Sequence, residues 1–229
     1  MNETIIQAAA LIVPLVFAIV FHEVAHGLMA RRLGDPTAEQ QGRLSFNPLK
    51  HVDPVGTIIV PGFLWLTTHT AFGWAKPVPV VASRLRHPRR DMMLVGAAGP
   101  GSNLIMAAIA AVALGFLMRP YLGQQEPTGV IGFVRLNLEN FITINVFLAL
   151  FNLLPIPPFD GSHIVEGLLP EALARNYAKL RVVGMLIPLL LIIVLPRLIP
   201  GFSATQYLIA PVEWALSWYG KLATLVAGV

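Results

Sequence analysis

A long apolar run from Ile5 to Ala30 constrains the fold of this chain more than any other feature of the sequence. At 1.5 Å per residue, a helix of this length crosses the roughly 30 Å hydrocarbon core of a bilayer. The run nevertheless contains His22, Glu23 and His26, in the sequence HEVAH. Ionisable residues inside a membrane span are costly and mark functional sites. The run therefore predicts a membrane helix with a polar site roughly 14 Å from its Arg31 end.

The HEVAH sequence has the spacing of a metal site. Residues i and i+4 lie on the same face of a helix, so His22 and His26 can bind one metal ion with Glu23 beside it. This is the zinc-protease pattern, in which the glutamate is the general base. The alternative is that the histidines only form hydrogen bonds between helices.

Composition indicates a single-domain polytopic membrane protein. The chain has 229 residues, of which 55% are hydrophobic and 12% are charged, about half the charged fraction of a soluble domain. It contains no cysteine, so a zinc site must use histidine and carboxylate ligands. The net charge of +4 comes from loops and is typical of membrane topology, not of nucleic-acid binding. The first run lacks the flanks of a cleaved signal, so we expect a retained span.

The predicted fold is all-α, with about five transmembrane helices and a re-entrant β-like hairpin between the first two. Residues 35–90 are too rich in proline and glycine for a long helix. Within them, residues 57–74 are apolar, but arginines flank them on both sides, which favours re-entry over crossing. A true span there would make six helices. The expected segments are 4–30, 91–118, 136–170 (a helix followed by NLLPIPPFDG), 182–199 and 204–226.

The distribution of basic residues predicts the orientation. Of 16 Lys and Arg, nine lie in residues 31–90 and three in 155–181, whereas three lie in the opposite loops. The positive-inside rule then places the N-terminus outside and the HEVAH site towards the cytoplasmic side of the cell (inner) membrane.

The third apolar helix ends in FNLLPIPPFDGSHI, whose prolines force the chain to unwind. Irregular backbone at membrane depth is tolerated where it lines a cavity. Because a catalytic zinc has three protein ligands and an open position for water, Asp160 is predicted to join His22 and His26 around one Zn²⁺ per chain. His51 and His163 are assigned supporting or structural roles.

Asn103 lies in the small-residue half of the second helix, roughly 18 Å from Asp91, and needs a hydrogen-bonding partner there. Binding substrate and bonding to another helix are equally favoured roles.

Together, HEVAH and NLLPIPPFDG resemble the site-2 protease family of intramembrane zinc metallopeptidases. The segments GRLSFNPLKHVDPVGT, FGWAKPVPV and AAGPGSN resemble its short bacterial branch, which has no PDZ or CBS domain. The resemblance covers about residues 15–170 and implies the zinc ligands and base named above. It also implies that Asn152 and the following prolines, including Pro157, hold the substrate backbone.

The resemblance implies that the substrate is a transmembrane segment of another protein, cut within the lipid bilayer. A helical substrate must first unwind, and we expect residues 42–82 and Asn152 to bind it as an added strand. Two alternatives are a divalent metal transporter, which does not need Glu23, and a non-catalytic membrane scaffold. Neither the native substrate nor the oligomeric state is predicted by the sequence.

Overall fold

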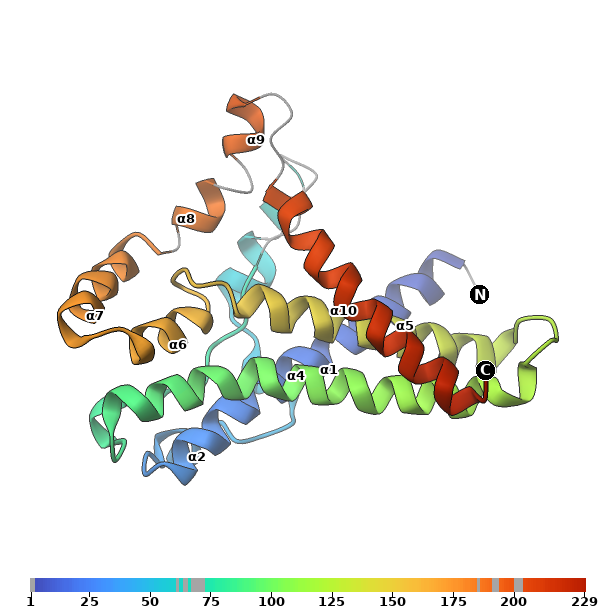
Figure 1. Ribbon diagram of the computed structural model, residues 1–229, viewed down its shortest axis with the longest axis horizontal. Helices are drawn as coiled ribbons and strands as arrows, with labels where there is room; N and C mark the ends of the chain where they lie inside the picture. The colour runs from blue at the N-terminus through green and yellow to red at the C-terminus, as the bar shows by residue number, and fades with distance from the viewer. Residues whose placement is uncertain are drawn as a thin grey trace.

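The computed structural model describes residues 3–60, 62–63, 66, 73–184, 186–190, 194–199 and 204–229. Its long helices are α1 (Glu3–Arg32), α4 (Pro88–Met118), α5 (Gly129–Asn152) and α10 (Ala204–Ala227). The short ones are α2 (Thr37–Gln40), η1 (Pro48–His51), η2 (Pro54–Ile59), η3 (Ala82–Arg84), η4 (Arg119–Tyr121), α6 (Gly161–Leu168), α7 (Glu171–Ala178), η5 (Lys179–Val182), α8 (Leu186–Leu189) and α9 (Leu195–Leu198). Figure 1 shows α4 and α5 running alongside each other, α1 and α10 crossing them at an angle, and α6 and α7 near the start of α4. None of the described residues forms a β-strand, so the fold is all-helical.

Three described helices, α1, α4 (with η4) and α5, are long and apolar enough to cross a membrane. Large apolar side chains are exposed on them, including Phe17, Ile109 and Phe147, whereas Asn103 and Asn145 are fully buried. Exposed apolar and buried polar side chains are the arrangement expected where lipid surrounds the helices. These helices are therefore consistent with a membrane location.

Helix α4 packs against α1, α5, α10 and α6. Its core contacts are made by small residues, because Ala107, Ala110 and Ala111 pack against side chains of α5 and α10. A Cβ atom at Gly115 would lie 2.5 Å from the Ala223 carbonyl oxygen of α10. The small side chains thus let the helices approach closely, as in other membrane bundles.

The connection between α1 and α4 is anchored to the end of α1 by Asp35. Gly34 ends the helix with a φ of 112°, and the Asp35 side chain is fully buried. Its carboxylate accepts hydrogen bonds from the Thr37 amide (3.0 Å) and hydroxyl and from the Val81 amide (2.6 Å). The Asp35 carboxylate therefore ties Thr37, near the start of the connection, to Val81, near its end.

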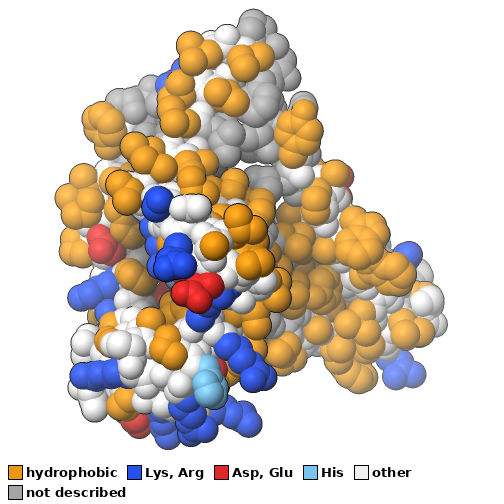
Figure 2. All heavy atoms as spheres, turned by 60° about the vertical axis from the view of Figure 1, so that its left-hand side comes forward, with side chains coloured by type: hydrophobic (Ala, Val, Ile, Leu, Met, Phe, Trp, Pro, Cys, Tyr) orange, Lys and Arg blue, Asp and Glu red, His pale blue; other side chains and the backbone are white. Residues whose placement is uncertain are grey.

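Basic side chains gather around this end of the molecule. Arg31 and Arg32 occupy the last turn of α1, and Arg89 and Arg90 lie in the first turn of α4. Figure 2 shows Lys and Arg side chains concentrated at one end of the visible face and hydrophobic side chains over much of the rest.

The β-like prediction is wrong for residues 57–59, which belong to helix η2. The Asp53 carboxylate accepts from the Val55 and Gly56 amides, and Pro54 occupies the first turn. This pair starts a helix. Residues 73–81 have no regular secondary structure, and residues 61, 64–65 and 67–72 of the predicted hairpin lie outside the described part of the chain.

Two helix predictions also differ from the structure. The predicted helix 182–199 starts later in the structure, because residues 182–184 form the end of η5 and a turn, and the described helical residues of this segment are 186–190 and 194–198. Residues 185 and 191–193 lie outside the description. Helix α5 begins at Gly129, not at residue 136, and its early polar residue Arg135 pairs with Glu126 (2.7 Å) and Glu139 (2.8 Å).

Candidate metal centre

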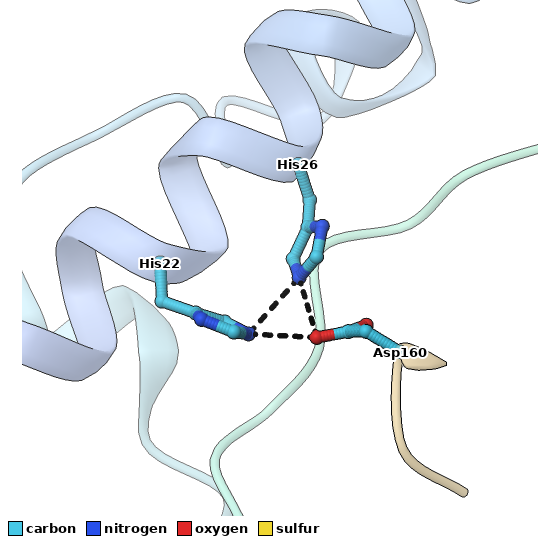
Figure 3. A group of neighbouring side chains, drawn as sticks. All are labelled: His22, His26 and Asp160. Carbon is cyan, nitrogen blue, oxygen red and sulfur yellow. Dashed lines mark hydrogen bonds and ion pairs between the residues drawn. The ribbon is translucent and has the colours of Figure 1, made fainter. Parts of the chain in front are cut away.

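His22, His26 and Asp160 converge on one point inside the molecule (Figure 3). The two histidines project from the same face of α1, and Asp160 immediately precedes α6. The His22 and His26 Nε2 atoms lie 3.0 Å apart. They lie 3.1 and 3.3 Å from the Asp160 Oδ2 atom. Asp160 follows His26 by 134 positions in the sequence, and the structure brings it together with both histidines.

The geometry of this donor set suits a single zinc ion. Tetrahedral ligand atoms at about 2.0–2.1 Å from zinc lie about 3.3 Å from one another. The three measured separations fall within a few tenths of an ångström of that value. The Asp160 Oδ2 atom is buried and has no hydrogen-bond donor, so a bound cation would compensate the cost of its burial.

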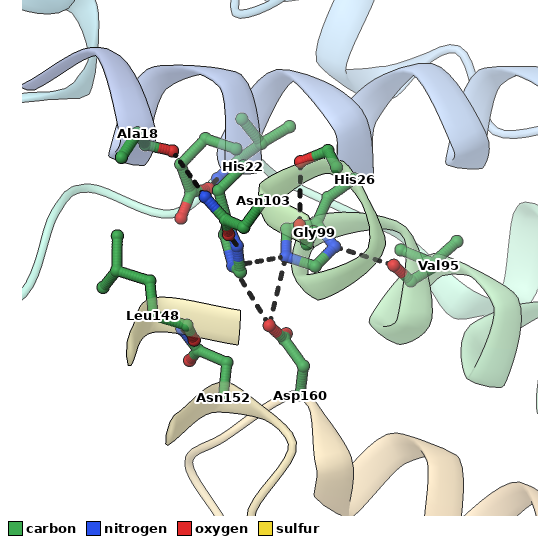
Figure 4. Close-up of polar contacts among 12 residues, drawn as sticks. Ala18, His22, His26, Val95, Gly99, Asn103, Leu148, Asn152 and Asp160 are labelled. Atoms are coloured by element: carbon green, nitrogen blue, oxygen red, sulfur yellow. Dashed lines mark hydrogen bonds and ion pairs between the residues drawn. The ribbon is translucent and has the colours of Figure 1, made fainter. Parts of the chain in front are cut away.

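Hydrogen bonds on the far side of each ring fix which nitrogen faces the centre (Figure 4). His22 Nδ1 lies 2.6 Å from the Asn103 side-chain oxygen, and His26 Nδ1 lies 2.7 Å from the Val95 carbonyl oxygen. Both partners are acceptors, so each Nδ1 carries the proton and donates. Each Nε2 then presents its lone pair to the centre, which is the arrangement typical of metal-bound histidine.

Close approach of α4 depends on glycine. A Cβ atom at Gly99 would lie 2.5 Å from the His26 Cε1 atom and 2.6 Å from the His22 Cε1 atom. A Cβ atom at Gly96 would lie 3.0 Å from the Asp160 carbonyl oxygen. The α4 backbone at Gly96 and Gly99 therefore packs directly against all three candidate ligands.

Glu23, the predicted base, is half-buried on α1 between the two histidines in sequence. Its Oε2 atom accepts a hydrogen bond of 2.7 Å from the Val78 amide. Within the described residues, its second carboxylate oxygen has no hydrogen-bond partner. Segment 73–81 thus holds one oxygen of this side chain through the Val78 amide and leaves the other free to accept a proton.

The three predicted substrate-binding residues have different surroundings. Asn103 is fully buried, and its side-chain nitrogen donates to the Ala18 carbonyl oxygen (3.2 Å) and to the Asn145 side-chain oxygen (2.7 Å). These contacts match the interhelical alternative. Asn152 is half-buried, and its nitrogen donates to the Leu148 carbonyl oxygen at 3.0 Å. Pro157 is buried and lies close to Gly184. A Cβ atom added at Gly184 would be 2.9 Å from the Pro157 Cβ atom.

His51 and His163 do not join this cluster, which is the only group of three or more His and acidic side chains in the described part of the chain that could hold a metal ion. His51 is buried and its Nε2 atom lies 2.8 Å from the Ser45 carbonyl oxygen. His163 contacts Arg181, which also pairs with Glu166. Burial and the charge of Arg181 lower the pKa of His163.

Sequence reasoning missed Asn145, the Val95 carbonyl and the Val78 amide. The backbone groups leave no signal in residue types. Asn145 does leave one, because it stands seven residues before Asn152 in an apolar helix and so lies on the same face.

Comparison with known families agrees with this geometry, since the sequence model described as "Peptidase family M50" matches residues 10–195. The chain belongs to peptidase family M50. This is the site-2 protease family that its motifs resemble. The match includes both histidines of α1, the two glycines of α4 and Asp160, so the whole candidate centre lies within the M50 region.

Two curated relatives of this M50 chain were found. It is 38% identical over 187 residues to the predicted zinc metalloprotease YwhC of Bacillus subtilis (strain 168), covering 80% of each chain. It is 27% identical over 219 residues to the predicted zinc metalloprotease Rip2 of Mycolicibacterium smegmatis, covering 90% of this chain and 72% of that protein. No solved structure matches.

Proposed function

We propose that this chain is a zinc-dependent intramembrane endopeptidase that cuts a transmembrane segment of another membrane protein. The observation that carries the proposal is the buried His22–His26–Asp160 cluster with Glu23 beside it on an apolar helix. Membership of family M50 and the names of the relatives support a zinc metalloprotease.

His22, His26 and Asp160 would hold the metal. Bound there, zinc would lower the pKa of a water molecule and polarise the scissile carbonyl group. The free oxygen of Glu23 would take the proton of the attacking water and deliver it to the leaving amine. The Val78 amide would keep the Glu23 carboxylate in place during both transfers.

Substrate binding is proposed for the polar end of α5 and for residues 73–81 beside Glu23. The Asn152 side-chain oxygen has no hydrogen-bond partner in the described residues and would accept from an unwound substrate. Pro157 would shape the turn that carries Asp160. A substrate strand added to residues 73–81 would lie next to Glu23, because the Val78 amide contacts that side chain.

The proposed location is the cell (inner) membrane, with the N-terminus outside and the site towards the cytoplasmic side. His22 lies ten residues before Arg32, the end of α1, which is about 15 Å along a helix. The basic residues at this end support that orientation.

The test is cleavage of a panel of tagged single-span proteins by the purified protein in liposomes. We expect Glu23→Gln to retain one zinc per chain and to lose cleavage by about 100-fold or more, because the general base is removed. Glu39→Gln is the matched control, since Glu39 pairs with Arg31 on the surface. Equal cleavage by Glu23→Gln and wild type would overturn the proposal. Zinc flux through both, without cleavage, would instead identify a transporter.

A further inference from the structure

A chain of two buried asparagines connects α5 to the metal centre on α1. Asn145 of α5 contacts Asn103 of α4, and Asn103 contacts His22 of α1 (Figure 4 shows the Asn103 end). Both asparagines are fully buried. Buried amides in an apolar bundle need all their partners, so the direction of each bond is informative.

Two backbone carbonyl groups determine how both amides are oriented. The Asn145 nitrogen lies 2.7 Å from the Phe141 carbonyl oxygen, and the Asn103 nitrogen lies 3.2 Å from the Ala18 carbonyl oxygen. A carbonyl oxygen only accepts, so each must face an amide nitrogen. The amide oxygen of Asn145 therefore faces the Asn103 nitrogen at 2.7 Å.

The same reasoning extends to the histidine. With its nitrogen occupied by Ala18 and Asn145, Asn103 can present only its oxygen to His22 Nδ1. That nitrogen must carry the proton, and Nε2 is left to face Asp160. If Asn103 were turned over, its nitrogen would donate to Nδ1 and the proton would move to Nε2, where it would block metal binding.

We propose that Asn145 is a positioning residue for the metal centre: by fixing the orientation of Asn103, it holds His22 with Nε2 unprotonated and directed at the metal. This inference rests on the proposed metal site. Asn145 does not contact the site itself, so its effect passes entirely through Asn103.

The chain offers a matched control in Asn140. This residue lies on the same helix, and its side-chain nitrogen donates to the Ala10 carbonyl oxygen of α1 at 2.8 Å. Asn140 therefore links α5 to α1 by a hydrogen bond between an amide and a backbone carbonyl group. It has no hydrogen bond to His22 or to Asn103 in the described residues. Comparing the two positions separates helix packing from control of the ligand.

The experiment measures zinc affinity of the full-length protein in detergent, by competition with a chromogenic chelator, together with its thermal unfolding. Asn145→Leu is expected to weaken zinc binding about ten-fold, the lower end of the range for residues behind a metal ligand. It should also change the visible spectrum of the Co²⁺-loaded protein. Asn140→Leu is expected to lower the unfolding temperature while leaving zinc affinity unchanged.

Asn145→Asp is the conservative variant. Burial keeps its carboxyl group neutral, and that group would donate to the Phe141 carbonyl oxygen and accept from Asn103. Zinc affinity within about two-fold of wild type is expected. Should Asn145→Leu not fold, Asn145→Ala makes the same comparison.

Wild-type zinc affinity in Asn145→Leu, or equal loss in Asn140→Leu, would overturn the inference. Because these readouts do not involve proteolysis, they are independent of the protease assignment. A wild-type protein that binds zinc and cuts nothing would refute the protease and leave the role of Asn145 standing.

Discussion

Replacing Gly99 by alanine is expected to destroy the metal centre while leaving the helix intact. The added Cβ atom would lie 2.5 Å from His26 Cε1 and 2.6 Å from His22 Cε1. Since carbon atoms pack at about 3.5–4.0 Å, both rings must move by about 1 Å. Metal–ligand distances tolerate only about 0.2 Å. Both Nε2 atoms would therefore leave the positions that bring them 3.1 and 3.3 Å from the Asp160 oxygen.

Gly99→Ala should change the stability of the fold much less than it changes zinc affinity. Alanine gains about 1 kcal/mol over glycine in a helix and overpacking costs about 1–3 kcal/mol, so the net cost to folding is about 0–2 kcal/mol. We expect zinc affinity to fall by about 100-fold, the upper end of the range for residues behind metal ligands. Cleavage should be lost, with the unfolding temperature shifted by a few degrees at most.

Two other glycines of α4 complete a graded series. A Cβ atom at Gly101 would meet nothing within 4 Å, whereas one at Gly96 would lie 3.0 Å from the Asp160 carbonyl oxygen. Gly101→Ala should therefore bind zinc as wild type does. The zinc affinity of Gly96→Ala should lie between those of Gly101→Ala and Gly99→Ala. Zinc titration and the cleavage assay measure the order. If Gly99→Ala and Gly101→Ala bound zinc equally, the close packing of α4 on the histidines would not control the site.

Two further predictions concern metal and pH. A strong zinc chelator should abolish cleavage and added zinc should restore it; activity that survives removal of all measured zinc would contradict a metalloprotease. Burial raises the pKa of Asp35, but hydrogen bonds from Thr37 and Val81 and the charge of Arg84 outweigh it, so the folded pKa lies below the ordinary value. The stabilisation from Asp35 is then fully present above the unfolded pKa of about 3.9 and is lost as pH falls through the lower folded pKa. Thermal unfolding between pH 3 and 6 should show a shallower acid dependence in Asp35→Asn than in wild type, and parallel curves would exclude this role.

The candidate ligands His22, His26 and Asp160, which the structure brings together, could be selected from the sequence because their signals are local. One helical turn separates His22 from His26, and prolines mark the unwinding before Asp160. The partners of these residues could not be predicted in the same way. That Asn103 meets His22, and Asn145 meets Asn103, depends on the register of α4 and α5, which no local pattern specifies.

The errors in the predicted fold have physical causes of the same kind. The density of proline in residues 35–90 argues against helix, but Pro54 together with the cap residue Asp53 starts the helix η2. The start of α5 was predicted too late because Arg135 was assigned to a loop. Its ion pairs with Glu126 and Glu139 let the helix include it.

The candidate ligands lie far apart in the order of synthesis. The histidines of α1 leave the ribosome first, the groups of α4 that orient them follow about 70 to 80 residues later, and Asp160 comes last. A nascent chain that contains only α1 and α4 thus holds two of the three candidate ligands and lacks Asn145, the proposed positioning residue for His22. The candidate metal centre therefore cannot be complete until α5 and the turn after it have been synthesised.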